Sequence, residues 1–181
     1  KTPLAKVIAG LNQITEGSIL LDGIDITDMD ITERAKFGIS YAFQQPVRFK
    51  GITVRDLLEL ASGGQMKEET ICEILAKVGM CTKDYIDREV NASLSGGEIK
   101  RIEIATVLAR RNSRLIIFDE PEAGIDLWSF SGLIDTFGEL KKDSDKALLV
   151  ITHQERLLEI ADEIAVIVDG KVRISGPGKE I

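Results

Sequence analysis

The sequence has few of the residues on which several classes of function depend. Its 181 residues include one histidine and two cysteines, too few for a zinc or iron-sulfur ligand set. The 23 Lys and Arg residues are outnumbered by 30 Asp and Glu, and the net charge of -7 gives no basic field for a nucleic-acid backbone or an anionic membrane surface. We therefore expect no nucleic-acid partner, and any phosphate that the protein binds must be held locally.

Long hydrophobic runs are also missing. No apolar stretch approaches the roughly 18 residues that cross a bilayer, and the first residues do not form the apolar core of a signal peptide. These absences predict a cytoplasmic protein with no direct membrane insertion. Cys72 and Cys81 show no ligand spacing, and we interpret both as ordinary packed thiols.

The hydrophobic pattern predicts an α/β fold with a buried parallel sheet. Two nearly continuous apolar runs lie on either side of a helical pattern, which is the order of a strand, a crossover helix and a second strand. Apolar segments around two Asp-Gly turns indicate edge hairpins. The expected strands are 39–43, 115–118 and 147–151, the hairpins are 18–26 and 165–174, and the helices are 1–12, 54–60, 68–78 and 127–140, besides one after residue 95.

Two adjacent carboxylates, Asp119 and Glu120, follow the apolar run 115–118. Such a pair, taken alone, more often caps a helix or is simply solvated. Here it lies at the carboxyl end of a buried parallel strand, which is where open α/β sheets bind ligands. One carboxylate can then hold Mg²⁺ while the other takes a proton from an attacking water. The position favours this catalytic interpretation.

Polar side chains also follow the other two strands. His153 comes directly after 147–151; a lone histidine is more often structural, but at this edge it can donate to a terminal phosphate and orient the base. Gln44 follows 39–43 and offers a neutral amide that can sense metal or water, although alone it would be read as a loop residue. The three strand ends thus predict one site.

The chain opens on Lys1 and Thr2 followed by a helix, which matches the end of the phosphate loop G-x-x-x-x-G-K-[ST]. In that motif the lysine neutralises the outer phosphates and the hydroxyl ligates Mg²⁺. A Lys-Thr pair alone is far more often surface, so the interpretation depends on the rest of the site. It predicts that the glycine loop and the strand before it precede Lys1 in a longer protein.

The segment SLSGGEIKR, residues 93–101, combines a helix cap with two glycines. Ser95 and Glu98 have the S-x-x-E spacing of a capping box, which predicts a long amphipathic helix starting near Gly96. Each glycine in the first turn costs up to ~1 kcal/mol relative to alanine. A cap alone does not require Gly96 and Gly97 together, so we expect something to approach this backbone closely.

The order of these motifs resembles that of ATP-binding-cassette (ABC) ATPases. Lys1-Thr2, Gln44, Leu94-Ser95-Gly96-Gly97-Glu98, the run 115–120, Ala123-Gly124-Ile125-Asp126 and His153 occur in the family's order. The resemblance implies ATP and Mg²⁺ as ligands and assigns the following roles: Lys1 and Thr2 end the Walker A loop, Gln44 is the Q-loop glutamine, Asp119 is the Walker B magnesium partner, Glu120 is the general base, Asp126 belongs to the D-loop and His153 is the switch histidine. Thr2, Gln44 and Asp119 are then the metal ligands.

The same resemblance offers a reason for the two glycines. In cassette ATPases the signature binds the terminal phosphate of ATP held by the opposite subunit, which implies that Ser95, Gly96 and Gly97 bind nucleotide in trans and that the protein forms an ATP-dependent dimer. It also implies a P-loop NTPase fold with a mostly parallel sheet and an inserted helical subdomain. We expect one domain over 1–181 without its N-terminal part, with a catalytic lobe of 1–48 and 112–181 and a helical signature subdomain of 49–111.

Within the family, three segments resemble the SufC type, the ATPase of the SUF iron-sulfur cluster assembly machinery. They are SGGEIKRIEI at 95–104, FQQPV at 43–47 with GIT at 51–53, and THQERLL at 152–158. This resemblance implies a SufB-type scaffold protein as the partner. Three departures are Pro3, which removes an amide that the family uses near the α-phosphate, a helical lobe shorter than is typical of SufC, and 161–165, which is more typical of transporter ATPases.

The alternative function is the ATP-binding subunit of an ABC membrane transporter. It uses the same chemistry, with a helix of the permease docking in the groove near Gln44. A DNA clamp of the SMC type would need long coiled-coil arms, for which the segment 54–91 has no room.

Overall fold

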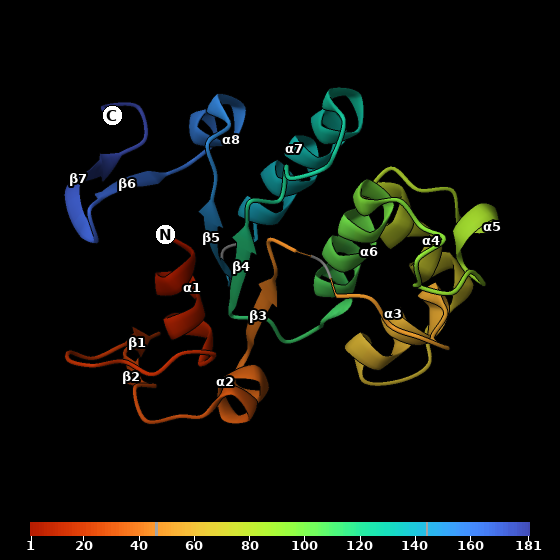
Figure 1. Cartoon of the computed structure of the whole chain (residues 1–181), viewed down its shortest axis with the longest axis horizontal. Coiled ribbons are helices and arrows are strands. Elements are labelled where there is room, and N and C mark those ends of the chain that lie inside the picture. Colours follow the sequence, from red (N-terminus) through yellow and green to blue (C-terminus); the bar gives the residue numbers. More distant parts are fainter. Residues whose placement is uncertain (46, 144) are drawn as a thin grey trace.

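The computed structural model describes residues 1–45, 47–143 and 145–181. Pro46, which belongs to the second SufC-like segment, lies outside the described residues. Figure 1 shows the elements, which follow one another as α1 (Thr2–Ala9), β1 (Leu20–Leu21), β2 (Ile24–Asp25), α2 (Ile31–Phe37), β3 (Ile39–Ala42), α3 (Val54–Ser62), α4 (Glu68–Lys77), α5 (Thr82–Tyr85), α6 (Gly96–Ala109), β4 (Leu115–Asp119), α7 (Leu127–Lys141), β5 (Ala147–Ile151), α8 (Glu155–Glu159), β6 (Glu163–Val168) and β7 (Lys171–Pro177).

A parallel sheet with the strand order β3-β4-β5 lies at the centre of the fold. Successive side chains of β4 enter different cores, because a strand directs them to opposite faces. Ile116 and Phe118 pack with α6 and α7 in the larger core, whereas Ile117 packs with α1 in the smaller one. The predicted strand, helix and strand and the α/β class are confirmed, and the carboxyl ends of the three strands point to one edge.

A group of helices and a hairpin lie on either side of this sheet (Figure 1). Helices α3 to α6 gather beside β3, and the hairpin β6-β7 lies beyond β5. Both predicted Asp-Gly hairpins are present, with positive φ at Asp22 and Gly23 and again at Asp169 and Gly170, as tight hairpin turns require. These hairpins are antiparallel and do not extend the parallel sheet.

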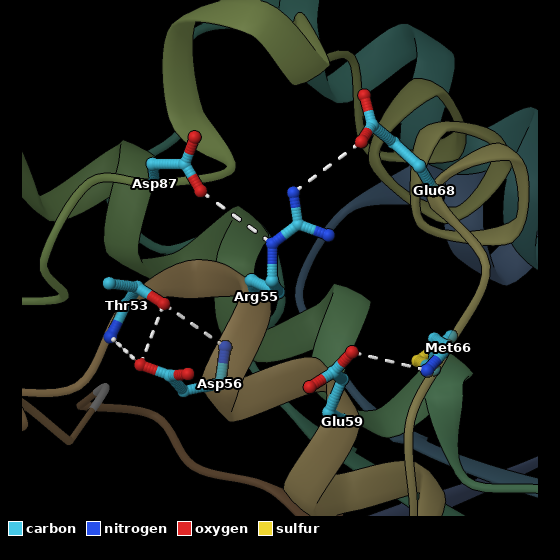
Figure 2. A network of polar contacts seen from close by, with 7 residues as sticks. All are labelled: Thr53, Arg55, Asp56, Glu59, Met66, Glu68 and Asp87. Atoms are coloured by element: carbon cyan, nitrogen blue, oxygen red, sulfur yellow. Dashed lines mark hydrogen bonds and ion pairs between the residues drawn. The ribbon is translucent and has the colours of Figure 1, made fainter.

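Polar contacts connect the helices beside β3, as Figure 2 shows. The Arg55 guanidinium lies 3.5 Å from Glu68 and 3.6 Å from Asp87, linking α3 to α4 and to the segment after α5. Thr53 and Asp56 form a capping box at the start of α3. Because both carboxylates that face Arg55 are largely exposed, each ion pair contributes at most ~1 kcal/mol. Apolar packing of α3 and α4 on α6 dominates this part.

Several local expectations were wrong. Helix α1 ends at Ala9, because Gly10 adopts the left-handed conformation at φ 85°. Helix α6 is not simply amphipathic: it lies between α3, α4 and the sheet and is buried on more than one face. Cys72 and Cys81 are exposed rather than packed. The short helices α2, α5 and α8 were not predicted.

Strand β5 is less buried than its apolar sequence indicated. It is the last strand of its sheet in the described structure, and four of its five residues are half-buried or exposed. A hollow of about 630 Å³ runs along it toward α1, α8 and β6, and its lining includes Leu148, Val150, Ile164 and Lys1. Edge position explains the difference, because one side of the strand has no neighbour in this sheet.

Candidate functional site

Three strand ends bring most of the predicted site residues to one edge of the sheet. Asp119 is the last residue of β4 and pairs with Ile151 at the end of β5. Gln44 follows β3 by two residues, and His153 follows β5 by two residues. Parallel register therefore places residues that are far apart in the sequence next to one another, at the edge where such sheets bind ligands.

Asp119 is completely buried, at 0% exposure, and is held by two hydroxyl groups. Thr2 Oγ1 donates to its Oδ1 at 3.2 Å, and Tyr41 Oη donates to its Oδ2 at 2.9 Å. Burial, followed by the hydrogen bond to Asp119, raises the pKa of the Tyr41 hydroxyl, so that it stays protonated and remains a donor. Thr2 at the start of α1 and Tyr41 in β3 thus fix the carboxylate from two sides.

The donors around Asp119 fit a magnesium ion. Mg²⁺ prefers hard oxygen ligands, and two oxygens each ~2.1 Å from one octahedral ion lie about 3 Å apart. The 3.2 Å between Thr2 Oγ1 and Asp119 Oδ1 is close to that spacing. Among the described residues no three His, Cys, Asp or Glu side chains cluster as a metal site. The donor set is therefore a mixed hydroxyl and carboxylate set, which is unlike that of a zinc or iron centre.

Glu120 stands in a strained backbone conformation beside Asp119. Its φ is 49°, a left-handed value that costs a non-glycine residue ~1–3 kcal/mol and is found mostly at functional positions. Its Oε2 accepts a hydrogen bond from Gln44 Nε2 at 2.7 Å, and its Oε1 lies 3.8 Å from His153 Nε2. Residues after all three strands therefore meet at the Glu120 carboxylate.

The loop after β5 is held by a residue that the sequence analysis missed. Glu122 Oε1 accepts from Thr152 Oγ1 at 2.8 Å and from the His153 backbone N–H at 3.2 Å. The His153 side chain itself is 69% exposed. Glu122 thus fixes the backbone of His153 while its imidazole stays open to a ligand. Its proximity in sequence to Glu120 was the available signal.

The predicted capping box at the start of α6 is confirmed. Ser95 Oγ accepts from the Glu98 backbone N–H, and Glu98 in turn accepts from the Ser95 backbone N–H. The Tyr85 hydroxyl also donates to Glu98. This hydrogen bond, ahead of the one from the Ser95 backbone, holds the pKa of Glu98 below its usual value. Glu98 therefore stays ionised at the positive end of the helix.

The two glycines of α6 differ in their surroundings. A Cβ on Gly97 would lie 2.7 Å from the carbonyl oxygen of Gly124, whose own φ is 76°. Around a Cβ on Gly96, no described heavy atom outside its chain neighbours and its own helix lies within 4 Å. Close packing inside the chain accounts for Gly97, whereas the open face at Gly96 is free for an approach from outside. Gly97 therefore has a structural reason of its own, and the expected approach of a ligand to this backbone stays a prediction.

Some predicted residues do not join the cluster around Asp119 and Glu120. Asp126 caps α7, where its Oδ1 accepts from the Ser129 backbone N–H at 2.9 Å; this bond lowers the pKa of the exposed Asp126 carboxyl. Among the described residues, the side-chain hydrogen bonds of Ser95 likewise stay within its own capping box. Lys1 is exposed at the start of α1. These groups flank the cluster, and a ligand would have to connect them.

An apolar recess of about 160 Å³ adjoins the segment after β3. Side chains from β3, α3 and α6 line it together with Phe43, Val47 and Phe49.

No helix in the described residues is long and apolar enough to cross a bilayer.

Comparison with known sequences gives consistent matches. The family model described as "ABC transporter" matches residues 1–123. An uncharacterized ABC transporter ATP-binding protein of Methanocaldococcus jannaschii is 43% identical over 100% of this chain and 75% of its own length. A probable ATP-dependent transporter of Synechocystis is 36% identical with the same two shares.

Solved structures show the same fold. The dimeric post-hydrolysis state of an ATP-binding cassette bound to ADP and Pi has a TM-score of 0.84 at 24% identity, covering 97% of this chain and 79% of its own. A bacterial Atm1-family ABC exporter with ATP bound has a TM-score of 0.83 at 21% identity, covering 99% of this chain and 32% of its own.

Proposed function

The chain belongs to the ABC transporter family and is an ATPase of that family. From this premise we propose that it is the ATP-binding subunit of a membrane transporter. In this proposal the chain forms a dimer, and its hydrolysis of ATP drives the transport. One observation carries the chemical part: the Glu120 carboxylate is held by the Gln44 amide at 2.7 Å directly beside the buried Asp119. The relatives, named as transporter proteins, support the biological part.

In the proposed mechanism Glu120 is the general base. It takes the proton of a water that attacks the γ-phosphate in line, and Gln44 and His153 orient the carboxylate and the phosphate. Lys1 binds the outer phosphates as a point charge. Thr2, Asp119 and the Gln44 amide oxygen would hold Mg²⁺. When bound, the ion neutralises charge on the phosphate oxygens.

The proposed dimer completes each site with a second copy of the chain. Ser95, the open backbone at Gly96 and the positive end of α6 bind the terminal phosphate of the ATP held by the other copy. Gly97 and Asp126 are proposed to lie at the same interface. Gly97 packs against Gly124, and Asp126 follows Gly124 by two residues. We also propose that 1–48 and 112–181 form the catalytic lobe and that 49–111 form the helical one.

We propose the apolar recess beside Gln44 as the docking place of the permease. It is lined by Phe43, Val47 and Phe49, close to the residue that touches Glu120. An apolar side chain on a helix of a membrane subunit can fill such a recess. Movement of the docked helix would then displace Phe43, and through it the neighbouring Gln44, which contacts the Glu120 carboxylate.

Iron-sulfur cluster assembly on a SufB-type scaffold is the second candidate. One observation favours it: in the SufC-like segment 95–104, Lys100 is buried and Glu103 is half-buried, and both contact Phe43. These two residues therefore hold the backbone next to Gln44, so the resemblance to SufC at 95–104 includes residues that support the candidate site. In this alternative the cluster would be built on the scaffold.

Co-purification tests the partner. The intact protein is tagged and isolated in mild detergent from its own cells. We expect a polytopic membrane protein to co-purify with it at a constant molar ratio. The matched variant Val47→Glu, which places a charge in the recess, should lose that protein and keep ATP binding. Recovery of a soluble scaffold without membrane proteins would support the second candidate and contradict the first.

A further inference from the structure

Lys100 in α6 is buried to an unusual degree. Its residue exposure is 0%, although a buried ammonium group loses its hydration and is seldom found without partners. The Nζ group donates to the backbone carbonyl of Phe43 and lies 3.5 Å from Glu103 Oε2. Burial lowers the pKa of Lys100, and Glu103 opposes that shift. The lysine therefore has a defined polar environment in the core.

Glu103, one turn further along α6, holds the other backbone group of the same residue. Its Oε1 accepts the Phe43 N–H at 2.9 Å, and burial raises its pKa. Phe43 comes directly after the end of β3, where the strand ladder no longer satisfies its backbone. The pair Lys100 and Glu103, called here the Phe43 clamp, thus satisfies both the carbonyl and the N–H of one residue.

Phe43 connects the clamp to the catalytic carboxylate. The next residue, Gln44, donates to Glu120 at 2.7 Å. At the N-terminal end of the same helix, Ser95 caps α6 five residues before Lys100, a rise of ~7.5 Å along a stiff element. A displacement of the start of α6 would therefore reach Gln44 through a continuous series of hydrogen bonds and covalent bonds.

We propose that Lys100 and Glu103 are positioning residues that set Gln44 against Glu120 in response to the phosphate bound at the start of α6. This inference rests on the proposed function, since the phosphate at α6 belongs to the ATP of the second copy. The clamp makes hydrolysis in one site dependent on closure of the dimer. It acts through Gln44 and touches neither the nucleotide nor the water.

Paired substitutions test the clamp without leaving a buried charge. Replacing both members of the pair by apolar residues of similar volume leaves no unpaired charge, and the loss of stability then comes mainly from the unpaired N–H and carbonyl of Phe43. The variant Lys100→Met with Glu103→Leu removes both contacts to Phe43. The matched variant Lys100→Met with Glu103→Gln restores an acceptor for the Phe43 N–H, because a glutamine keeps one amide oxygen in place of the carboxylate.

For the Met/Leu pair we expect unchanged ATP-dependent dimerisation and unchanged KM, with kcat reduced at least tenfold; the Met/Gln pair should recover a large part of kcat. Hydrogen exchange at the Phe43 amide supplies a readout other than activity: ATP should slow it in the wild type and leave it unchanged in the Met/Leu pair.

Two results would overturn the inference. One is a Met/Leu pair with wild-type kcat in the ATP-bound dimer. The other is a parallel loss of thermal stability, dimerisation and kcat in both pairs, because the clamp would then be only structural. Failure of the wild-type protein to dimerise with ATP would instead overturn the proposed function, and this inference with it.

Discussion

Replacing Glu120 by glutamine is expected to reduce ATP turnover by about 10²- to 10⁴-fold, the usual contribution of a general base, while ATP binding is retained. Glutamine has nearly the same shape and can still accept the Gln44 amide that lies 2.7 Å from Glu120. It cannot take a proton from water. The geometry of the site is therefore kept and only its basicity is removed.

The same substitution should accumulate the ATP-bound dimer, because the phosphate that we propose to bridge the two copies is no longer cleaved. Phosphate release measures turnover, and light scattering with and without ATP measures the dimer. Glu73→Gln, at an exposed position of α4, is the matched control and should behave as wild type. Unimpaired turnover of the Glu120 variant would remove Glu120 from its role.

Alanine at Gly96 and alanine at Gly97 should have opposite effects on folding and function. At Gly96 the methyl group meets no described atom outside its chain neighbours and its own helix within 4 Å, and alanine is favoured over glycine by up to ~1 kcal/mol in a helix. We expect equal or higher thermal stability, but turnover reduced about tenfold or more, equivalent to ~1.4 kcal/mol. The added methyl would occupy the space proposed for the phosphate of the ATP held by the second copy.

At Gly97 the added Cβ would lie 2.7 Å from the Gly124 carbonyl oxygen, so one of the two backbones must move. Overpacking of this kind costs ~1–3 kcal/mol, and the melting temperature should fall. Calorimetry and turnover, measured on both variants, separate the two effects. Wild-type turnover of Gly96→Ala would contradict an approach from outside at that glycine.

The sequence predicted those features that depend on local pattern. The apolar runs placed β4 and β5, and the turn residues placed both hairpins. The cap at Ser95 and the residues after each strand followed from sequence spacing. Parallel strand ends necessarily meet at one edge, so the order of strands and polar residues along the chain was enough to group Gln44, Glu120 and His153.

Other features depend on contacts between distant segments and were not predictable. Tyr41 reaches Asp119 across 78 positions of sequence, which requires the strand register. The approach of Gly124 to Gly97 and the burial of Lys100 on Phe43 depend on how α6 packs. Helix α2 did have a local signal, the capping box of Asp30 and Glu33, but its seven residues are too short for a clear hydrophobic period.

The exposed cysteines show the limit of composition as evidence. A free cysteine is usually buried, but Cys72 lies on the outer face of α4 and Cys81 precedes α5. Burial there is decided by helix phase: the neighbouring Ile71, Ile74 and Leu75 take the inner positions of α4. Residue type alone could not supply that phase.

Mixing two inactive variants tests the composite site most directly. Copies with Glu120→Gln keep an intact start of α6, and copies with Gly96→Leu keep an intact Glu120. A mixed dimer then contains one site with both intact halves, so combining the two preparations in the presence of ATP should restore turnover well above that of either alone. Turnover that stays at the level of the separate variants, while pull-down of one tagged variant recovers the other as a mixed dimer, would contradict a catalytic site shared between two copies.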